Sequence, residues 1–221
     1  MKLIAISSSP RENSNSLDLL LDATNPLEIP VELYDLREAS FCSCSCCGSC
    51  TGESCVHDDY ITGLWEKIAS PECIGLLLST PVHFGLASEL LIKFLYRGRF
   101  IRHRDFAAYA KPFGVIAVAG RRSGGAETTI TSTWLPLIRQ GMFPVGNGTE
   151  TSQYGAMVWA GKKGEAMTDE YGVQQARDLA KNVEQIGKLM YHGKQHCTYT
   201  PPKFSHTAGT IGAPLNCLDN L

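Results

Sequence analysis

Cysteines are concentrated in one short stretch, FCSCSCCGSCTGESC, which spans residues 41–55 and holds six of the chain's nine cysteines. One register within it gives the spacing CxxCxxCx4C, which is made by Cys44, Cys47, Cys50 and Cys55. Four thiolates within twelve residues suit a cubane iron–sulfur cluster, because a compact loop can wrap closely around it. Structural zinc sites usually present two separated CxxC turns, so zinc and a redox dithiol stay as alternatives. The neighbouring Cys42 and Cys46 leave open which four thiolates are ligands.

A polar stretch, Ser7–Ser16, follows the apolar run Leu3–Ile6. It carries hydroxyl, amide and guanidinium groups that could hold an anion: Ser9, Arg11, Ser14, Asn15 and Ser16. Together with the free N–H groups of a helix start, these groups suit a phosphate monoester. Ordinary turn and capping chemistry is the alternative, but the position after a buried strand favours phosphate. Neither GxxxxGKS/T nor GxGxxG occurs here, so a P-loop and a Rossmann fingerprint are excluded.

Five apolar runs, separated by helical patterns, predict the strands that position these loops. They are residues 3–6, 31–36, 74–78, 115–119 and 156–160, with 142–145 as a companion to the last. Runs that are apolar on both faces suit parallel strands covered by helices on each side. The alternation predicts an α/β fold, a flavodoxin-like doubly wound sheet of five parallel strands in the order 2-1-3-4-5. The cysteine-rich insert follows strand two.

Bulk composition narrows the functions that these sites could serve. The chain has 221 residues, a net charge of −2 and 43% hydrophobic residues, which is typical of a globular protein. The net charge gives no sign of a basic surface that would bind nucleic acid, and no apolar run approaches the roughly 20 residues of a membrane span. The apolar run near the N-terminus is too short for a signal peptide, so we expect a cytoplasmic protein. Clustered thiols in that reducing compartment indicate metal or redox chemistry.

Three loops at predicted strand ends resemble the NADPH-dependent FMN reductase family. They are SPRENSNS in the first polar stretch, TPVHFG at residues 80–85 and GGAETT at residues 124–129. The resemblance covers roughly residues 2–190 and implies a flavin-dependent oxidoreductase that binds FMN. This chain departs from the family's pattern at His83 and Ala126, where Tyr and Gln are usual. We therefore assign no proton-transfer role to His83.

The resemblance also assigns the FMN-binding residues. Those of the first loop are Ser9, Arg11, Ser14, Asn15 and Ser16, and those around the ring are Pro81, Val82, His83, Phe84, Gly85, Ala119, Gly120, Gly124 and Gly125. A backbone stiffened by proline offers N–H and C=O groups to the pyrimidine edge of the flavin. Paired glycines let the backbone approach the ring closely. No catalytic side chain is assigned.

The fold and the cysteine motif together resemble the iron–sulfur flavoproteins of anaerobic archaea and bacteria. This resemblance implies one 4Fe-4S cluster and one FMN per chain, a ferredoxin-like electron donor, and a homodimer or homotetramer. Because the insert follows strand two, at the sheet edge that carries the flavin loops, we expect the cluster of one subunit near the flavin of another. We expect one FMN-binding domain over residues 1–195, a cluster loop at about 41–56 and a C-terminal extension over 196–221.

The predicted function is electron transfer between a one-electron carrier and FMN, and onward to a two-electron acceptor. No Ser–His–Asp or paired-carboxylate pattern supports hydrolysis. The first alternative is an NAD(P)H-dependent FMN or quinone reductase whose cysteines are structural, and oxidation of NAD(P)H stays open. The second is a zinc-stabilised interaction module without enzymatic activity. Nucleic acid and membranes are not among the expected partners.

Overall fold

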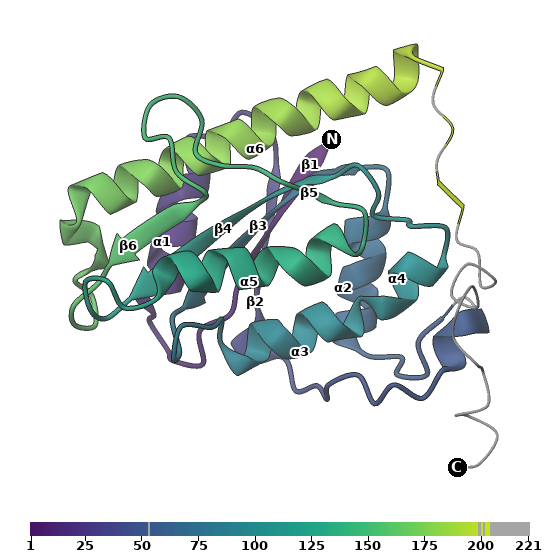
Figure 1. The fold of residues 1–221 in the computed structure, drawn as a ribbon, viewed down its shortest axis with the longest axis horizontal. Helices are drawn as coiled ribbons and strands as arrows, with labels where there is room; N and C mark the ends of the chain where they lie inside the picture. The colour runs from purple at the N-terminus through teal and green to yellow at the C-terminus, as the bar shows by residue number, and fades with distance from the viewer. Residues whose placement is uncertain (53, 199, 201, 204–221) are drawn as a thin grey trace.

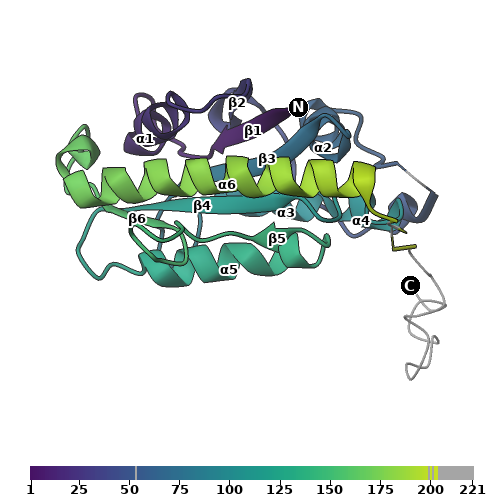
Figure 2. The ribbon, with the colours of Figure 1, turned by 90° about the horizontal axis from the view of Figure 1, so that it is seen from above.

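The computed structural model describes residues 1–52, 54–198, 200 and 202–203, and its core is one parallel β-sheet (Figure 1). The strands are β1 (Lys2–Ser7), β2 (Val31–Asp35), β3 (Cys73–Pro81), β4 (Pro112–Ala119), β5 (Phe143–Pro144) and β6 (Ala156–Trp159). Their order is β2-β1-β3-β4-β5, and β6 also pairs with β4. Figure 2 shows the strands side by side in this order. The predicted order 2-1-3-4-5 is confirmed.

The fifth position of the sheet is shared by two short strands. β5 pairs with the first two residues of β4, whereas β6 pairs with its last four, Ile116–Ala119. The chain leaves the sheet between them and returns to it at Ala156. The predicted companion of the fifth strand is thus a separate strand, and β6 carries the next loop to the carboxyl end of the sheet.

Helices cover both faces of the sheet. They are α1 (Asn15–Thr24), α2 (Tyr60–Ala69), α3 (Glu89–Arg97), α4 (Arg99–His103), α5 (Ala126–Ile138) and α6 (Glu170–His196). One core contains residues of α1 and α6 together with Leu3, Ala5 and Leu77 of the strands. The other contains residues of α2, α3, α4 and α5. Alternate residues of the central strands face the two cores, which is why β1, β3 and β4 are mostly apolar, whereas the edge strand β2 has the sequence VELYD.

Side-chain caps fix where α1, α2 and α3 begin. Ser14 accepts a hydrogen bond from the N–H of Leu17 and starts α1, and Ser88 does the same for α3. Asp59 accepts from the N–H groups of Ile61 and Thr62 and starts α2. Each cap satisfies an amide that the helix itself leaves without a partner. The first and third helices therefore begin directly behind the loops that were predicted to bind a ligand.

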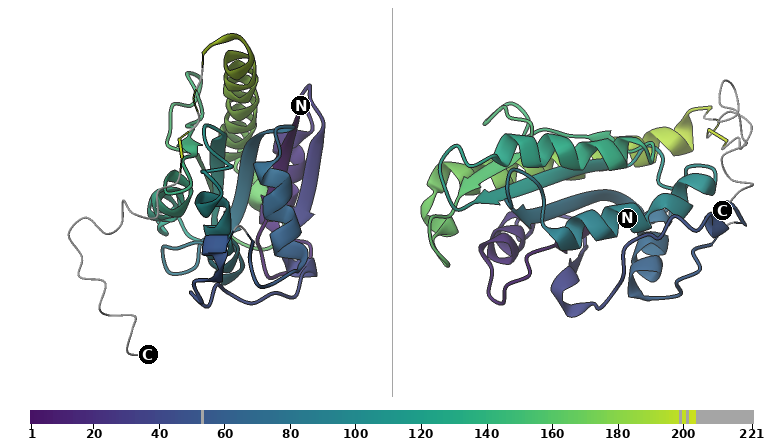
Figure 3. Two further views of the ribbon diagram at one scale, coloured as in Figure 1. Left: turned by 90° about the vertical axis from the view of Figure 1, so that its right-hand side faces the viewer. Right: turned by 60° about the horizontal axis from the view of Figure 1, so that its bottom comes forward.

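The cysteine-rich insert takes a path that the sequence did not indicate. It leaves β2 at the carboxyl edge, runs along the molecule and forms a short 3-10 helix, η2 (Ser49–Gly52), beside α4 (Figure 3, right). In Figures 1 and 2, β6 and α1 lie at one end of the molecule, and η2 and α4 lie at the other. The expectation that the cysteines share an edge with the flavin loops is wrong for this chain.

The C-terminal extension predicted over 196–221 lies mostly outside the described residues. Within the described part, α6 ends at His196 and is followed by Cys197. None of the described helices combines the length and the apolar character that would let it cross a membrane.

Candidate functional site

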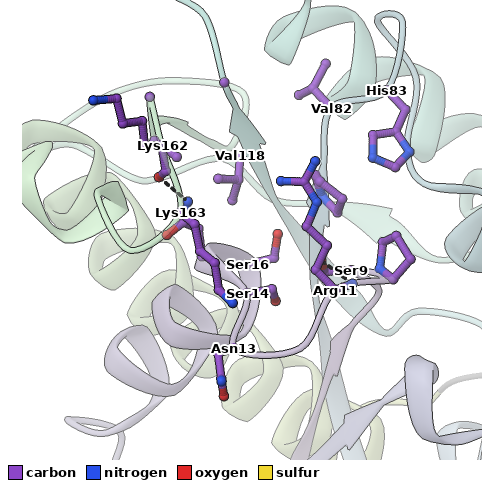
Figure 4. A pocket seen from close by; sticks show the side chains of 16 residues that line it. Ser9, Arg11, Asn13, Ser14, Ser16, Val82, His83, Val118, Lys162 and Lys163 are labelled. Carbon is purple, nitrogen blue, oxygen red and sulfur yellow. Dashed lines mark hydrogen bonds between the residues drawn. The ribbon is translucent and has the colours of Figure 1, made fainter.

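A pocket of about 240 Å³ opens at the carboxyl ends of β1, β3, β4 and β6 (Figure 4). The predicted residues that line it are Ser9, Arg11, Ser14, Asn15, Ser16, Pro81, Val82, His83 and Gly120. The sequence analysis missed the others, which are Pro10, Asn13, Val118, Ala160, Gly161, Lys162 and Lys163. We call this cavity the flavin pocket, segment 7–16 the phosphate loop and segment 161–164 the lysine loop. Four loops from distant parts of the sequence thus meet in one pocket, and only the lysine loop was not predicted.

Buried hydroxyl groups fix the phosphate loop to the neighbouring elements. Ser8 donates to the carbonyl of Ser79 on β3 at 3.0 Å, and the Ser88 hydroxyl of α3 donates to the carbonyl of Ser8 at 2.6 Å. Within the loop, Ser9 accepts from the N–H of Arg11 at 3.2 Å. A serine that accepts an internal hydrogen bond can still donate its own hydrogen to a ligand. These hydrogen bonds therefore fix the backbone of the phosphate loop, while hydroxyl groups of the loop can still donate to a ligand in the pocket.

Asn15 connects the phosphate loop to the lysine loop. Its amide nitrogen donates to the carbonyl of Lys162 at 3.0 Å, and its amide oxygen accepts from the N–H of Gly164 at 2.8 Å. The Asn15 side chain is thus engaged by protein, although the sequence analysis assigned it to the phosphate. The signal that could have revealed the lysine loop is the run GKKG directly after the last predicted strand.

The flavin pocket is electrostatically positive. The described residues that line it include three cations, Arg11, Lys162 and Lys163, and no aspartate or glutamate. In Figure 4 the guanidinium of Arg11 reaches over the pocket and the Lys163 side chain extends in the direction of Ser14 and Ser16, whereas the Lys162 side chain turns away. Hydroxyl groups, a helix start and the two cations whose side chains are directed to the pocket, Arg11 and Lys163, are donors of the kind that a phosphate monoester requires. The donor set therefore fits the phosphate of FMN.

The two loops predicted to surround the ring contact each other. A Cβ added to Gly125 would lie 2.8 Å from the Cα of Gly85, and both glycines have positive φ angles. Val82 donates its N–H to the carbonyl of Val118 at 2.9 Å, which ties the loop to β4. Phe84, which the resemblance assigns to the surroundings of the ring, is fully exposed and has a φ of 54°.

A second cavity, of about 440 Å³, adjoins the flavin pocket beyond the end of β4. Three of the predicted flavin residues line this cavity and not the first one: Ala119, Gly124 and Gly125. Its other side carries Arg121, Arg122 and Trp159, with the Arg122 guanidinium 5.5 Å from the Trp159 ring centre. Arginine above an aromatic ring gives a favourable cation–π contact. This cavity is therefore suited to a flat or anionic molecule.

Five cysteines line a small cavity of about 20 Å³ beside α4: Cys44, Cys46, Cys47, Cys50 and Cys55. All four predicted ligands are among them, and all the described cysteines carry free thiols. Cys42 lies apart, with its sulfur 3.6 and 3.7 Å from the ring nitrogens of His57. Of the two spare thiols, Cys46 is therefore the one that could replace a predicted ligand. We call segment 41–55 the cysteine loop.

A buried arginine anchors the base of the cysteine loop. The side chain of Arg97 is 1% exposed and donates to both carboxylate oxygens of Asp59, at 2.7 and 2.8 Å. It also donates to the Thr62 hydroxyl at 2.9 Å and to the carbonyl of Cys42 at 3.2 Å. A bidentate arginine–carboxylate pair fixes both the position and the orientation of the two side chains. The end of α3 thus holds the start of the cysteine loop and the cap of α2 together.

The thiols of the cysteine loop occupy different electrostatic surroundings. Hydrogen bonds from Ser49 lower the pKa of the Cys47 thiol, whereas burial raises the pKa of the Cys50 thiol. The Cys50 sulfur lies 4.0 Å from Nδ1 of His103, and Arg99 borders the same cavity. Among the described residues, no three His, Cys, Asp or Glu side chains are gathered as a bound metal would require. The donor set, four thiols on one loop beside an arginine, nevertheless fits an iron–sulfur cluster chemically.

The fold and the pocket at the carboxyl ends of the strands define a flavodoxin-like protein whose first loop, after β1, lines the pocket with hydroxyl groups and an arginine. Residues 1–154 match the family of NADPH-dependent FMN reductases, and the chain belongs to this family. It is therefore a flavin-dependent oxidoreductase, which excludes the alternative of a non-enzymatic zinc module.

Two proteins with similar sequences are named iron–sulfur flavoproteins. The chain is 32% identical over 194 residues to an iron–sulfur flavoprotein of Methanocaldococcus jannaschii, which covers 86% of this chain and 99% of the relative. It is 26% identical over 195 residues to an iron–sulfur flavoprotein of Archaeoglobus fulgidus, covering 85% of this chain and 96% of the relative. The crystal structure of RosB with a bound riboflavin 5'-phosphate derivative has the same fold, with a TM-score of 0.66 at 15% identity over 97% of this chain and 95% of RosB.

Proposed function

We propose that this chain transfers electrons between a one-electron carrier and FMN through a 4Fe-4S cluster, and then delivers them to a two-electron acceptor. The observation that carries the proposal is that one chain presents both a carboxylate-free cationic pocket and a loop of clustered thiols. A flavin takes up one or two electrons, whereas a cluster passes one at a time, so together they couple the two kinds of carrier. We propose that this occurs in the cytoplasm, where free thiols persist.

The chain's own residues would bind and orient the flavin. The hydroxyl groups of Ser9, Ser14 and Ser16 and the guanidinium of Arg11 would hold its phosphate. Pro81, Val82 and His83 would border the ring. The close approach of Gly85 to Gly125 would fix the positions of the two loops around the ring relative to each other. Val82 and Val118 make part of the pocket wall apolar, which would limit the access of water to the ring.

The cysteine loop would hold the cluster through Cys44, Cys47, Cys50 and Cys55. Their spacing supports these four ligands, and their common cavity agrees with it. Arg97 would position the loop, and the positive charge of Arg99 beside the cavity would partly balance the negative charge of the thiolates. Cys46 borders the same cavity, so a variant lacking Cys46 is needed to exclude it as a ligand.

The path of the cysteine loop supports a role for a second copy of this chain. α3 begins beside the phosphate loop, where Ser88 donates to the Ser8 carbonyl, and ends at the cysteine loop, where Arg97 donates to the Cys42 carbonyl. Its 9 residues span about 14 Å at 1.5 Å each, so the two sites of one chain lie at opposite ends of this helix. An apolar groove of about 280 Å³ between α3 and α5 contains Leu86, Tyr96 and Leu135, all exposed. We propose that a second copy covers this groove in a homodimer or homotetramer, with its cysteine loop near the flavin pocket of the first.

Arginines beside the cysteine loop support an acidic, ferredoxin-like protein as the electron donor. Arg99 on α4 and Arg139 at the end of α5 both act on Arg102, whose pKa is lowered by burial and by these two charges. The chain as a whole has a net charge of −2, so this concentration of positive charge is local. Complementary charges accelerate the association of carrier proteins, and added salt weakens that effect.

Anaerobic purification followed by quantitative analysis tests the proposed function. We expect flavin, iron and acid-labile sulfide in the ratio of one FMN to four irons and four sulfides, and little zinc. Replacing Cys44 by Ser should remove the iron and sulfide but leave the flavin, because the two sites lie at different ends of the molecule. Zinc in place of iron, or iron that is unaffected by replacing any of the four cysteines, would refute the proposal.

A second candidate function, the direct oxidation of NAD(P)H, is supported by the cavity next to the flavin pocket. Arg121 and Arg122 could bind phosphate groups there, and Trp159 offers an aromatic surface for a base. Stopped-flow reduction of the flavin under anaerobic conditions separates the two candidates. Rapid reduction by reduced ferredoxin and slow reduction by NADPH would support the first, and the reverse order would support the second.

A further inference from the structure

Lys163 reaches the flavin pocket from a segment that follows the part of the chain matched to the family. The match ends at residue 154, whereas the lysine loop begins at Gly161. In Figure 4 the Lys163 side chain points across the pocket in the direction of Ser14 and Ser16, at the start of α1. No described carboxylate forms an ion pair with Lys163. Its charge is therefore available to a ligand in this pocket.

The position of Lys163 is fixed by its neighbours on both sides. The carbonyl of Lys162 and the N–H of Gly164 bond to the two ends of the Asn15 amide, at 3.0 and 2.8 Å. A side-chain amide that bonds to the residues before and after Lys163 holds that backbone in one orientation. Asn15 is itself the first residue of α1, directly after the capping residue Ser14. The lysine loop and the phosphate loop are consequently held as one unit.

The charge of the ligand requires more than one cation. A phosphate monoester carries a charge of about −1.5 to −2 at pH 7. Arg11 provides one positive charge on the phosphate loop, and no Asp or Glu of the described pocket lining neutralises it. We propose that Lys163 supplies the second positive charge for the flavin phosphate, and that Asn15 is the positioning residue that holds it there. This inference rests on the proposed function, because it assumes that FMN occupies the pocket.

Selectivity for the phosphorylated flavin follows from this arrangement. Riboflavin has the same ring and ribityl chain as FMN but lacks the phosphate. Removing the Lys163 charge should therefore weaken the binding of FMN and leave the binding of riboflavin unchanged. The neighbouring Lys162 provides a matched comparison, because it has the same charge and exposure while its side chain turns away from the phosphate loop.

Fluorescence titration of flavin-free protein with FMN and with riboflavin tests the inference. The variants are Lys163→Gln, Lys162→Gln and Asn15→Ala. We expect Lys163→Gln to weaken FMN binding about tenfold, which corresponds to one charge-assisted hydrogen bond, and to change riboflavin binding less than twofold. Lys162→Gln should change FMN binding less than threefold. Asn15→Ala should lower the preference for FMN over riboflavin, because Lys163 loses its support.

Three outcomes would overturn the inference. They are equal losses of FMN affinity in the two lysine variants, an equal loss of riboflavin and FMN affinity in Lys163→Gln, and an unchanged preference for FMN in Asn15→Ala. The lysines are exposed, so the folded state should tolerate both replacements, and circular dichroism checks this. If the unchanged protein binds neither flavin, the proposed function fails instead, and the two failures are therefore distinguishable.

Discussion

Replacing Arg97 by Met should destabilise the protein by about 3 kcal/mol. The Arg97 side chain is 1% exposed and Asp59 is 27% exposed. Removing one partner of a buried ion pair costs about 3–5 kcal/mol, because the other charge stays behind without compensation. Water reaches part of the Asp59 carboxylate, so we take the lower end of this range. The carbonyl of Cys42 also loses its donor, which should free the start of the cysteine loop.

Urea denaturation of the cofactor-free protein, followed by circular dichroism, measures this loss. With a denaturant slope of about 2–3 kcal/mol per molar, the midpoint should fall by about 1 M or slightly more. The control is Lys93→Gln on the same helix, which breaks a surface pair of 2.8 Å with Glu89. Its cost should be about 0.3–0.5 kcal/mol. A loss below about 1 kcal/mol for Arg97→Met, or equal losses in the two variants, would refute the reasoning.

The dependence on pH provides an independent check of the same pair. Burial raises the pKa of Asp59, but the hydrogen bonds from Arg97 and the backbone outweigh it, so the pKa lies below the ordinary 3.8. A carboxyl group with a lowered folded pKa stabilises the protein fully above its unfolded pKa, and this contribution is lost as the pH falls through the folded pKa. The difference in stability between wild type and Arg97→Met should therefore be complete at pH 7 and shrink below about pH 4.

Three further changes have expected outcomes. Burial lowers the pKa of Lys111 from 10.5 to about 8. Between pH 8 and 10.5 the unfolded chain therefore binds this proton while the folded protein does not, so the free energy of unfolding should rise with pH by about 3 kcal/mol in total. Urea unfolding of Lys111→Met should lack this rise. Ser88→Ala removes a buried donor to the Ser8 carbonyl and the cap of α3, and should cost about 1–2 kcal/mol in thermal unfolding. Gly125→Ala places a Cβ against Gly85 at a φ of +95°, and should cost about 1–3 kcal/mol and weaken FMN binding in fluorescence titration; unchanged binding would contradict the contact between the ring loops.

The centre of the sheet could be predicted because nearly all residues of β1, β3 and β4 are buried. In β3, all residues from Cys73 to Thr80 are buried, and such a run has a strong sequence signal. β5 is only two residues long, and the division of the fifth strand depends on its pairing with β4 rather than on its own sequence. The short α4 was missed because its sequence, RFIRH, is mostly basic and has no helical repeat of apolar residues.

The site could be predicted in part, for a similar physical reason. The phosphate loop and Val82 follow buried strands directly, so their place at the carboxyl edge follows from the strand order. The path of the cysteine loop does not, because the insert between Asp35 and Asp59 is long enough to reach either end of the sheet. Its position depends on Arg97, which is distant in sequence, and no local pattern indicates that contact.

Asn15 has a consequence for how the protein matures. Its two partners, Lys162 and Gly164, lie 147 and 149 positions after it in the chain, so a nascent polypeptide emerging from the ribosome presents Asn15 long before its partners exist. Retention of the prosthetic group would then report that biosynthesis has passed the sixth strand. If Asn15 positions Lys163 as proposed, firm binding of FMN is reached only after Lys162 and Gly164 have been synthesised.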